Sequence, residues 1–120
     1  MAGTLTVVTA AVQGGIAKYT LTWVSSSGGA VSANLFDLWP GEIVKAKFVP
    51  SGSVVPSDGY DVTLVDTNSC DLLNGVGLNL SSTTAFAATP AVYHDGAQQV
   101  DLVVADAGNA KGGTVTLWVR

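Results

Sequence analysis

Charged side chains are scarce in this chain of 120 residues. Asp, Glu, Lys and Arg make up 12% of it, about half of their share in an average soluble domain. A surface with so little charge is poorly protected against association with other molecules. The shortage therefore indicates either that a partner normally covers part of the surface, or only that Thr and Ser supply the surface polarity.

Other absences exclude whole classes of protein. The single cysteine, Cys70, excludes an internal disulfide and a multi-cysteine zinc site. No run approaches 18 consecutive apolar residues, so we expect no membrane-spanning helix and no membrane partner. The opening residues, MAGTLTVVTAAVQGG, lack a basic stretch and a long apolar run, so we expect no signal peptide and synthesis in a reducing cytoplasm.

Basic residues are also few and are scattered along the sequence, and the net charge is −4. They are Lys18, Lys45, Lys47, Lys111 and Arg120. Because they form no basic run, we expect no nucleic-acid partner.

What the chain has in abundance is alternation of apolar and polar residues with a period of two. Extended stretches are expected over 4–12, 19–24, 30–39, 42–49, 60–64, 70–73, 82–88, 91–94, 100–104 and 115–119. Turn-forming residues separate them, and some of the shorter stretches are marginal. Eight or nine short strands of this kind predict one all-β domain over residues 1–120, an antiparallel β-sandwich in which jelly-roll and immunoglobulin-like orders are both open.

Two stretches carry more detailed expectations. In the strand over 42–49, Val44, Ala46 and Phe48 should face the core, and Lys45 and Lys47 should face the other side. The less regular stretch 74–81 is expected to hold a single helical turn. The segment 106–113 is expected to be a turn before the final strand.

The stretch Asp66-Thr67-Asn68-Ser69-Cys70-Asp71 resembles a calcium loop, because hard cations need several oxygen ligands. A helix-flanked calcium loop beginning at Asp66 would need an oxygen ligand, Gly and Glu where Cys70, Asp71 and Gly77 stand. The same residues form turns readily through bonds to their own backbone. We therefore predict a turn and no metal, with a weak surface calcium site as the alternative.

The sequence contains no recognisable set of catalytic residues. The one histidine, His94, lies beside Asp95 in the sequence Tyr-His-Asp-Gly, which predicts a turn, and no nucleophile elbow accompanies it. Glu42 is the one glutamate, and Asp61 and Asp101 fall on the polar faces of predicted strands. We predict no catalytic residue, no cofactor and no small-molecule substrate.

Aromatic residues provide the best candidates for an interface. Tyr19, Trp23 and Tyr60 share the phase of apolar rows and should lie in the core, whereas Trp118 is out of phase with its neighbours and should face outwards. An exposed Trp on the last strand is an anchor for a protein partner or for a glycan. We select as candidate interface residues Trp118, Arg120, Trp39, Lys45 and Lys47.

Three segments together resemble small all-β structural proteins encoded beside the capsid genes of tailed bacteriophages. They are YTLTW over 19–23 with its Ser/Gly turn, GYDVTLVD over 59–66 with the continuation DLLNGVG over 71–77, and AGNAKGGTVTLWVR over 107–120. The similarity spans most of the chain, its motifs are not catalytic, and it is weakest over 85–99.

The resemblance implies a non-enzymatic component of the virion that is made in the bacterial cytoplasm. The function it favours is capsid decoration, in which the major capsid protein and further copies of the chain would be the partners, as a homo-oligomer. A tail or head–tail connector component is the alternative within the virion, and a carbohydrate-binding β-sandwich is the alternative outside this class.

Overall fold

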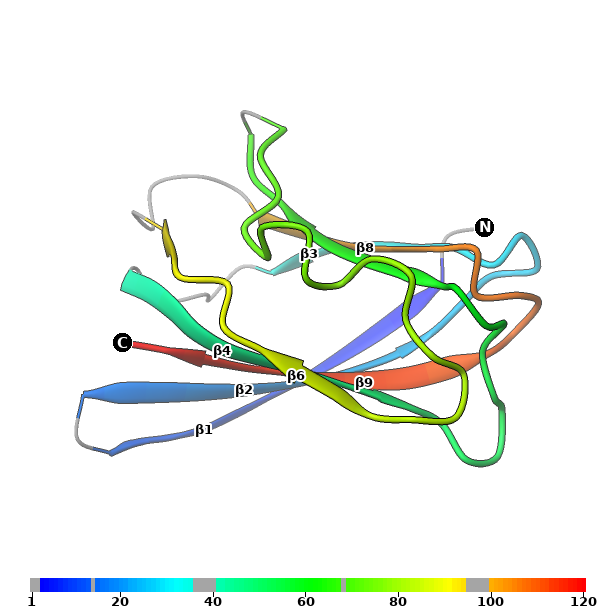
Figure 1. The fold of residues 1–120 in the computed structure, drawn as a ribbon, viewed down its shortest axis with the longest axis horizontal. Helices are drawn as coiled ribbons and strands as arrows, with labels where there is room; N and C mark the ends of the chain where they lie inside the picture. The colour runs from blue at the N-terminus through cyan, green and yellow to red at the C-terminus, as the bar shows by residue number, and fades with distance from the viewer. Residues whose placement is uncertain (1–2, 14, 36–40, 68, 95–99) are drawn as a thin grey trace.

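The computed structural model describes residues 3–13, 15–35, 41–67, 69–94 and 100–120, which form nine strands in two antiparallel sheets packed face to face (Figure 1). The all-β sandwich expected from the alternation is confirmed. The strands are β1 (Thr4–Gln13), β2 (Ile16–Val24), β3 (Val31–Leu35), β4 (Gly41–Pro50), β5 (Asp61–Val65), β6 (Phe86–Ala88), β7 (Val92–His94), β8 (Val100–Ala105) and β9 (Gly112–Val119).

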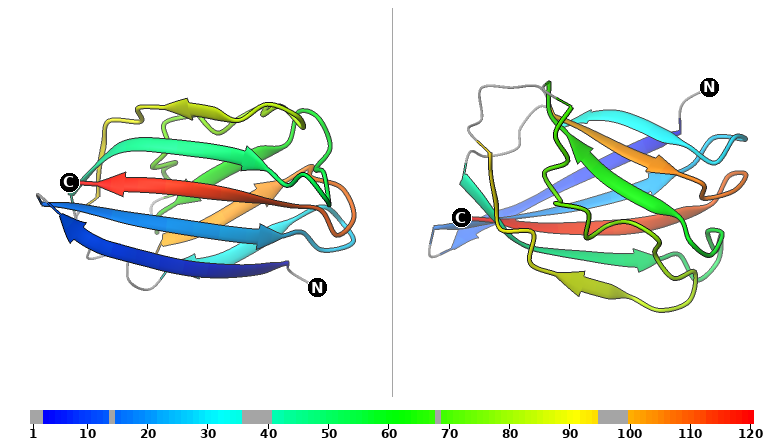
Figure 2. Two further views of the ribbon diagram at one scale, coloured as in Figure 1. Left: turned by 90° about the horizontal axis from the view of Figure 1, so that it is seen from below. Right: turned by 45° about the horizontal axis from the view of Figure 1, so that its top comes forward.

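The strand order is that of a jelly roll. In the large sheet the order is β1-β2-β9-β4-β6, with β7 also paired to β4, and in the small sheet it is β3-β8-β5 (Figure 2, left, shows the large sheet face on). The segment 71–80 occupies the place of a fourth strand beside β5, through the bridges Tyr60–Leu80 and Val65–Asp71. Leaving β1 aside, this is the arrangement of two interleaved Greek keys.

The core follows from the period of two. In β9, Val115, Leu117 and Val119 are buried, and β5 and β8 alternate in the same way. The two sheets meet at Trp23 and Tyr60, which come from opposite layers, with ring centroids 5.6 Å apart. Each large apolar side chain that is fully buried contributes about 1.5–3 kcal/mol, so this layer of contacts holds the sandwich together.

Gly113 is a strand residue, although the sequence places it in a turn. It lies opposite Trp23 in the register of β2 with β9. A Cβ at this position would stand 2.8 Å from Cζ2 of the Trp23 ring. The glycine therefore makes room for the indole, and the expected turn over 106–113 ends earlier, where β9 begins at Gly112.

One predicted strand face is wrong because of a β-bulge. Ile43 pairs with Val119 and Lys45 pairs with Trp118, so Val44 is an extra residue on β4. The bulge shifts the phase, so that Ile43 is buried and Val44 is only half-buried. Beyond the bulge the prediction is correct: Ala46 and Phe48 are buried, and Lys45 and Lys47 are exposed.

The stretch after β5 also differs from the prediction. The expected strand over 70–73 is a series of turns, with one isolated bridge at Asp71, and the expected helical turn over 74–81 is likewise turns and bends. Cys70, at the start of the strand expected over 70–73, is exposed. Backbone bonds such as Val62 N to Gly77 O (2.7 Å) replace a regular ladder here.

Burial of Tyr60, which is 1% exposed, raises the pKa of its phenol from 10.0 to about 12. The folded state favours the neutral phenol, so this contribution to stability is complete below about pH 10 and is lost as the pH rises through about 12. We expect the free energy of unfolding, measured in urea, to fall more steeply between about pH 10 and 12 in the parent protein than in Tyr60→Phe. Identical pH profiles for the two proteins would contradict this assignment.

Candidate functional site

Trp118 faces outwards from the large sheet, as the sequence predicts. It alternates with the buried residues Leu117 and Val119 on β9, and its own side chain is half-buried. Strand β9 lies between β2 and β4, so Trp118 has Lys18 opposite it on one side and Lys45 on the other. Residues opposite each other in antiparallel strands project from the same face, which brings three outward side chains together.

Both lysines contact the Trp118 ring. The Nζ atom of Lys45 lies 5.0 Å from the ring centroid, and that of Lys18 lies 5.6 Å from it. An exposed cation–π contact of this kind contributes roughly 0.5–1 kcal/mol. The pair of contacts brings the two ammonium groups over one indole.

Two further basic residues lie on the same face. Lys47 is opposite Thr116 on β9. Arg120 follows Trp118 and pairs with Glu42, with Nη2 and Oε1 3.7 Å apart. We call the outward surface formed by Lys18, Lys45, Lys47, Trp118 and Arg120 the basic face.

Threonines supply the rest of this surface. Thr6, Thr22 and Thr114 lie opposite one another across β1, β2 and β9, and Thr20 lies opposite Thr116. β-Branched threonine suits a strand and adds a hydroxyl without adding charge. The basic face therefore continues into an uncharged polar ladder.

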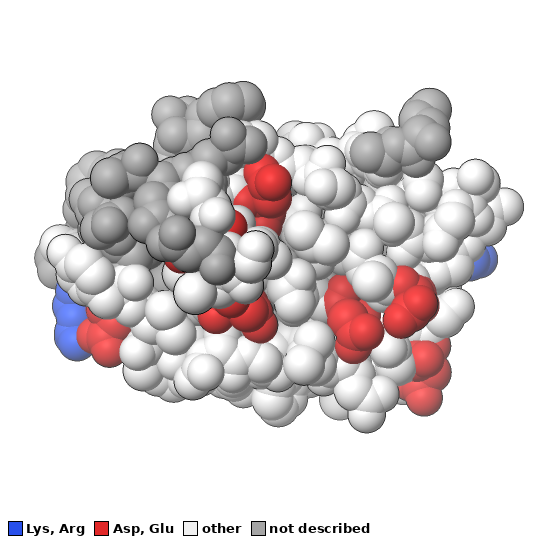
Figure 3. Space-filling view, turned by 90° about the horizontal axis from the view of Figure 1, so that it is seen from above, with Lys and Arg blue, Asp and Glu red and all other residues white. Residues whose placement is uncertain are grey.

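Charge is segregated between the two sheets. Four of the five basic residues belong to the basic face. Six of the seven described carboxylates instead belong to β5, β8 or the adjoining loops, and Figure 3 shows them across the other side of the molecule, with basic groups only at its edges. They are Asp58, Asp61, Asp66, Asp71, Asp101 and Asp106.

Four of the five basic residues, although scattered in the sequence, are therefore grouped on one face of the folded protein. Four predicted interface residues, Trp118, Arg120, Lys45 and Lys47, come together on one sheet, while Trp39 lies outside the described residues. Lys18 was missed, although its alternation with buried Ala17 and Tyr19 shows that it points outwards. Only the pairing of β2 with β9, which no local pattern reveals, places it at Trp118.

Tyr93 was not selected as an interface residue, yet it is 70% exposed. It lies on β7 opposite Glu42, which in turn pairs with Arg120. The basic face thus has an exposed aromatic residue near its border, in addition to the half-buried Trp118.

No family model, curated protein or solved structure matches this chain. The residues themselves therefore carry the argument about function. No helix in the described part of the chain has the length and apolar character needed to cross a bilayer.

The loop from Asp66 to Asp71 is built as a turn. Oδ1 of Asp66 accepts a bond from the Cys70 N–H (3.0 Å). Oδ1 of Asp71 accepts from the N–H groups of Leu64 (3.1 Å) and Leu73 (2.9 Å), and its Oδ2 accepts from that of Gly75 (3.0 Å). Among the described residues, no group of three or more His, Cys, Asp or Glu side chains is arranged to hold a metal ion.

The other acidic candidates also have structural contacts. Asp61 accepts a bond from the Asn79 N–H (2.8 Å), and Asp101 accepts one from Nδ2 of Asn34 (3.0 Å). His94, expected in a turn, is the last residue of β7 and lies opposite Gly41. The backbone of His94 is thus in a strand, in agreement with the extended stretch expected over 91–94, and the turn expected at this residue is wrong.

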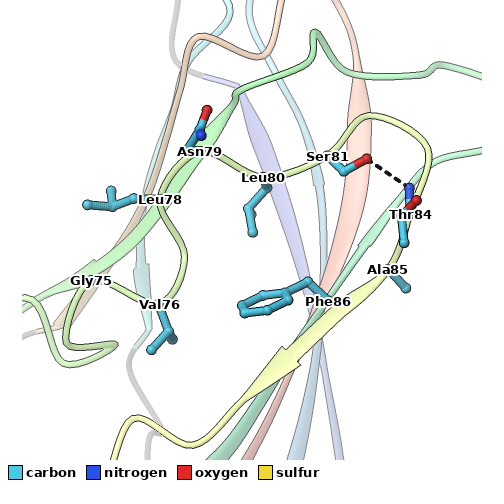
Figure 4. Close-up of a pocket in the computed structure, with 9 residues that line it drawn as sticks. All are labelled: Gly75, Val76, Leu78, Asn79, Leu80, Ser81, Thr84, Ala85 and Phe86. Atoms are coloured by element: carbon cyan, nitrogen blue, oxygen red, sulfur yellow. Dashed lines mark hydrogen bonds between the residues drawn. The ribbon is translucent and has the colours of Figure 1, made fainter.

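A cavity of about 450 Å³ lies at the edge of the sandwich, between the segment 75–81 and β6. Phe86 and Leu80 point into it (Figure 4), and Phe86 stacks on the core residue Phe48 with centroids 6.4 Å apart. Ser81 Oγ accepts a bond from the Thr84 N–H at 3.1 Å. None of the described lining residues carries a titratable side chain, so this lining offers packing and a few hydroxyls but no acid or base.

Replacement of Trp118 should affect binding more than folding. We expect Trp118→Ala to lower the free energy of unfolding by less than about 1.5 kcal/mol, because the side chain lies outside the core. Trp23→Ala should cost about 3–5 kcal/mol, since it empties the contact between the sheets. Urea unfolding of both variants measures this, and equal losses would show that Trp118 is part of the core.

Asp71 should stabilise the fold without a metal. Asp71→Ala leaves three backbone N–H groups without their acceptor, and we expect a loss on the order of 2 kcal/mol in urea unfolding. Asp106→Asn, at an exposed position, serves as the control and should change stability by less than about 0.5 kcal/mol. The melting temperature should be the same with and without EDTA; a lower value with EDTA would establish the calcium alternative.

Proposed function

We propose that this protein is a non-enzymatic structural component of a bacteriophage virion, a decoration protein that docks on the outer surface of the capsid through its basic face. The observation that carries the proposal is the convergence of Trp118, Arg120, Lys45 and Lys47 on one sheet. These residues come from two distant segments of the chain, and they concentrate most of the positive charge of an acidic protein on one side.

The resemblance to phage structural proteins supports the same function. Its segments 19–23 and 107–120 belong largely to β2 and β9, which are neighbours in the large sheet. The second of them contains Trp118 and Arg120, so the similar residues include part of the basic face. The third segment, 59–66, spans β5 in the small sheet.

The dimensions suit a repeated contact on a lattice. The accessible surface is 5967 Å². A standard interface of about 800 Å² per partner would cover about an eighth of it, which leaves room for contacts with further copies. Many modest contacts made together on a shell give strong retention without a large interface in each copy.

A carbohydrate platform is less well supported. Two lysine ammonium groups already lie within 5.6 Å of the Trp118 ring centroid, so a sugar that stacks on this ring would compete with them. Binding on a glycan array that is lost in Trp118→Ala would nevertheless establish that function in place of shell binding.

Counting the copies in purified virions tests the proposal. A decoration protein should be present at on the order of hundreds of copies per particle, because it follows the symmetry of the shell. Quantitative mass spectrometry against the major capsid protein gives the ratio. A ratio of only a few copies per particle would assign the protein to the tail or connector, and its absence from particles would refute the virion function.

A further inference from the structure

The two lysines at Trp118 have no carboxylate beside them. Within the described part of the chain the ion pair joins Arg120 to Glu42, while Lys18 and Lys45 contact only the indole among charged or aromatic groups. Two like charges held over one ring disfavour each other, and a negative group between them would relieve this. The site is thus complementary to an anion that this part of the chain does not supply.

We propose that the basic face docks on an acidic protein surface, and that a carboxylate of the partner is held between the ammonium groups of Lys18 and Lys45, beside Trp118. This inference rests on the proposed function, because it specifies the chemistry of the shell surface that the face contacts. Trp118 is the anchor of the contact, and Lys47 and Arg120 lie around it.

Charge complementarity supports an acidic protein as the occupant. The protein carries four of its five basic residues on the large sheet and most of its described carboxylates on the small sheet and its loops; Figure 3 shows the acidic side. Near an acidic surface, such a molecule is turned with the large sheet towards the surface and the small sheet away from it. Charges at the border speed and orient association, while a central tryptophan excludes water from the contact.

Nucleic acid fits this surface less well. The basic face has four cations, one of which is already paired with Glu42. Its remaining polar groups are uncharged threonines in registered rows. A surface that follows a phosphate backbone needs a denser line of basic groups. A few carboxylates spaced on a folded protein match the number and spacing of these cations.

A peptide titration tests the chemistry of the site without a virus. The probe is a capped tetraglutamate peptide, the control is capped tetraglutamine, and the readout is the ¹⁵N–¹H spectrum of the intact protein. We expect the Trp118 indole N–H and the amides of Lys18 and Lys45 to shift with tetraglutamate, and the shifts to weaken as salt is added, because salt screens attraction between exposed charges. Equal shifts with tetraglutamine, or shifts centred on the small sheet, would overturn the inference.

Binding to purified shells that lack the protein tests the docking itself. Lys45→Glu and Lys111→Glu change the net charge equally, but Lys111 lies away from the basic face, next to the glycines that open β9. We expect Lys45→Glu and Trp118→Ala each to weaken binding at least about tenfold, and Lys111→Glu to weaken it less than about threefold.

The possible outcomes of these experiments distinguish failure of the docking inference from failure of the proposed function. Equal losses in Lys45→Glu and Lys111→Glu, with the parent protein still bound, would overturn the inference and leave the decoration function standing. Failure of the parent protein to bind any shell would refute the function, and the peptide titration would then decide the inference alone. Tighter binding to a DNA oligonucleotide than to tetraglutamate, or self-association through Lys45, would overturn the choice of partner.

Discussion

The pairing of β9 with β2 on one side and with β4 on the other is the constraint on which the rest of this structure depends. Because these three strands pair in antiparallel register, residues opposite one another project from the same face of the sheet. The alternation along β9 therefore determines both the buried face and the outward face. Val115, Leu117 and Val119 contribute to the core, while Trp118 between them is brought to Lys18 and Lys45. A shift of one residue in either register would bury the charges and expose the core.

Local sequence patterns are sufficient to predict the buried face of a strand where the strand keeps the period of two along its whole length. The buried rows of β5, β8 and β9 can be read directly from the chain, and the outward direction of Trp118 follows from the same reasoning. The bulge at Val44 cannot be read in this way, because it depends on how β4 fits β9. The turns over 71–80 are similar: they are held by Asp71 and by long-range backbone bonds, whose partners are not local.

The candidate site shows the same division between local and non-local information. Period-two alternation identifies which lysines point outwards, but it does not say which strands are neighbours. The jelly-roll order brings the second and last strands together, although Trp118 lies 100 residues after Lys18 in the sequence. The clustering of positive charge is therefore a property of topology, and a linear search for a basic run could not detect it.

The clustering of positive charge has a strong electrostatic effect because the protein has few other charges to offset it. In a protein with many mixed charges, four cations on one sheet would be balanced by neighbouring acids and would define no direction. Here the described acids lie on β5, β8 and their loops, and many of them already accept backbone or side-chain N–H bonds, so they are held in place. The opposite sheet has one described carboxylate, Glu42, and it is paired with Arg120. The electric field of the molecule is consequently directed from one sheet to the other. An approaching partner therefore meets a surface whose orientation the fold has already determined.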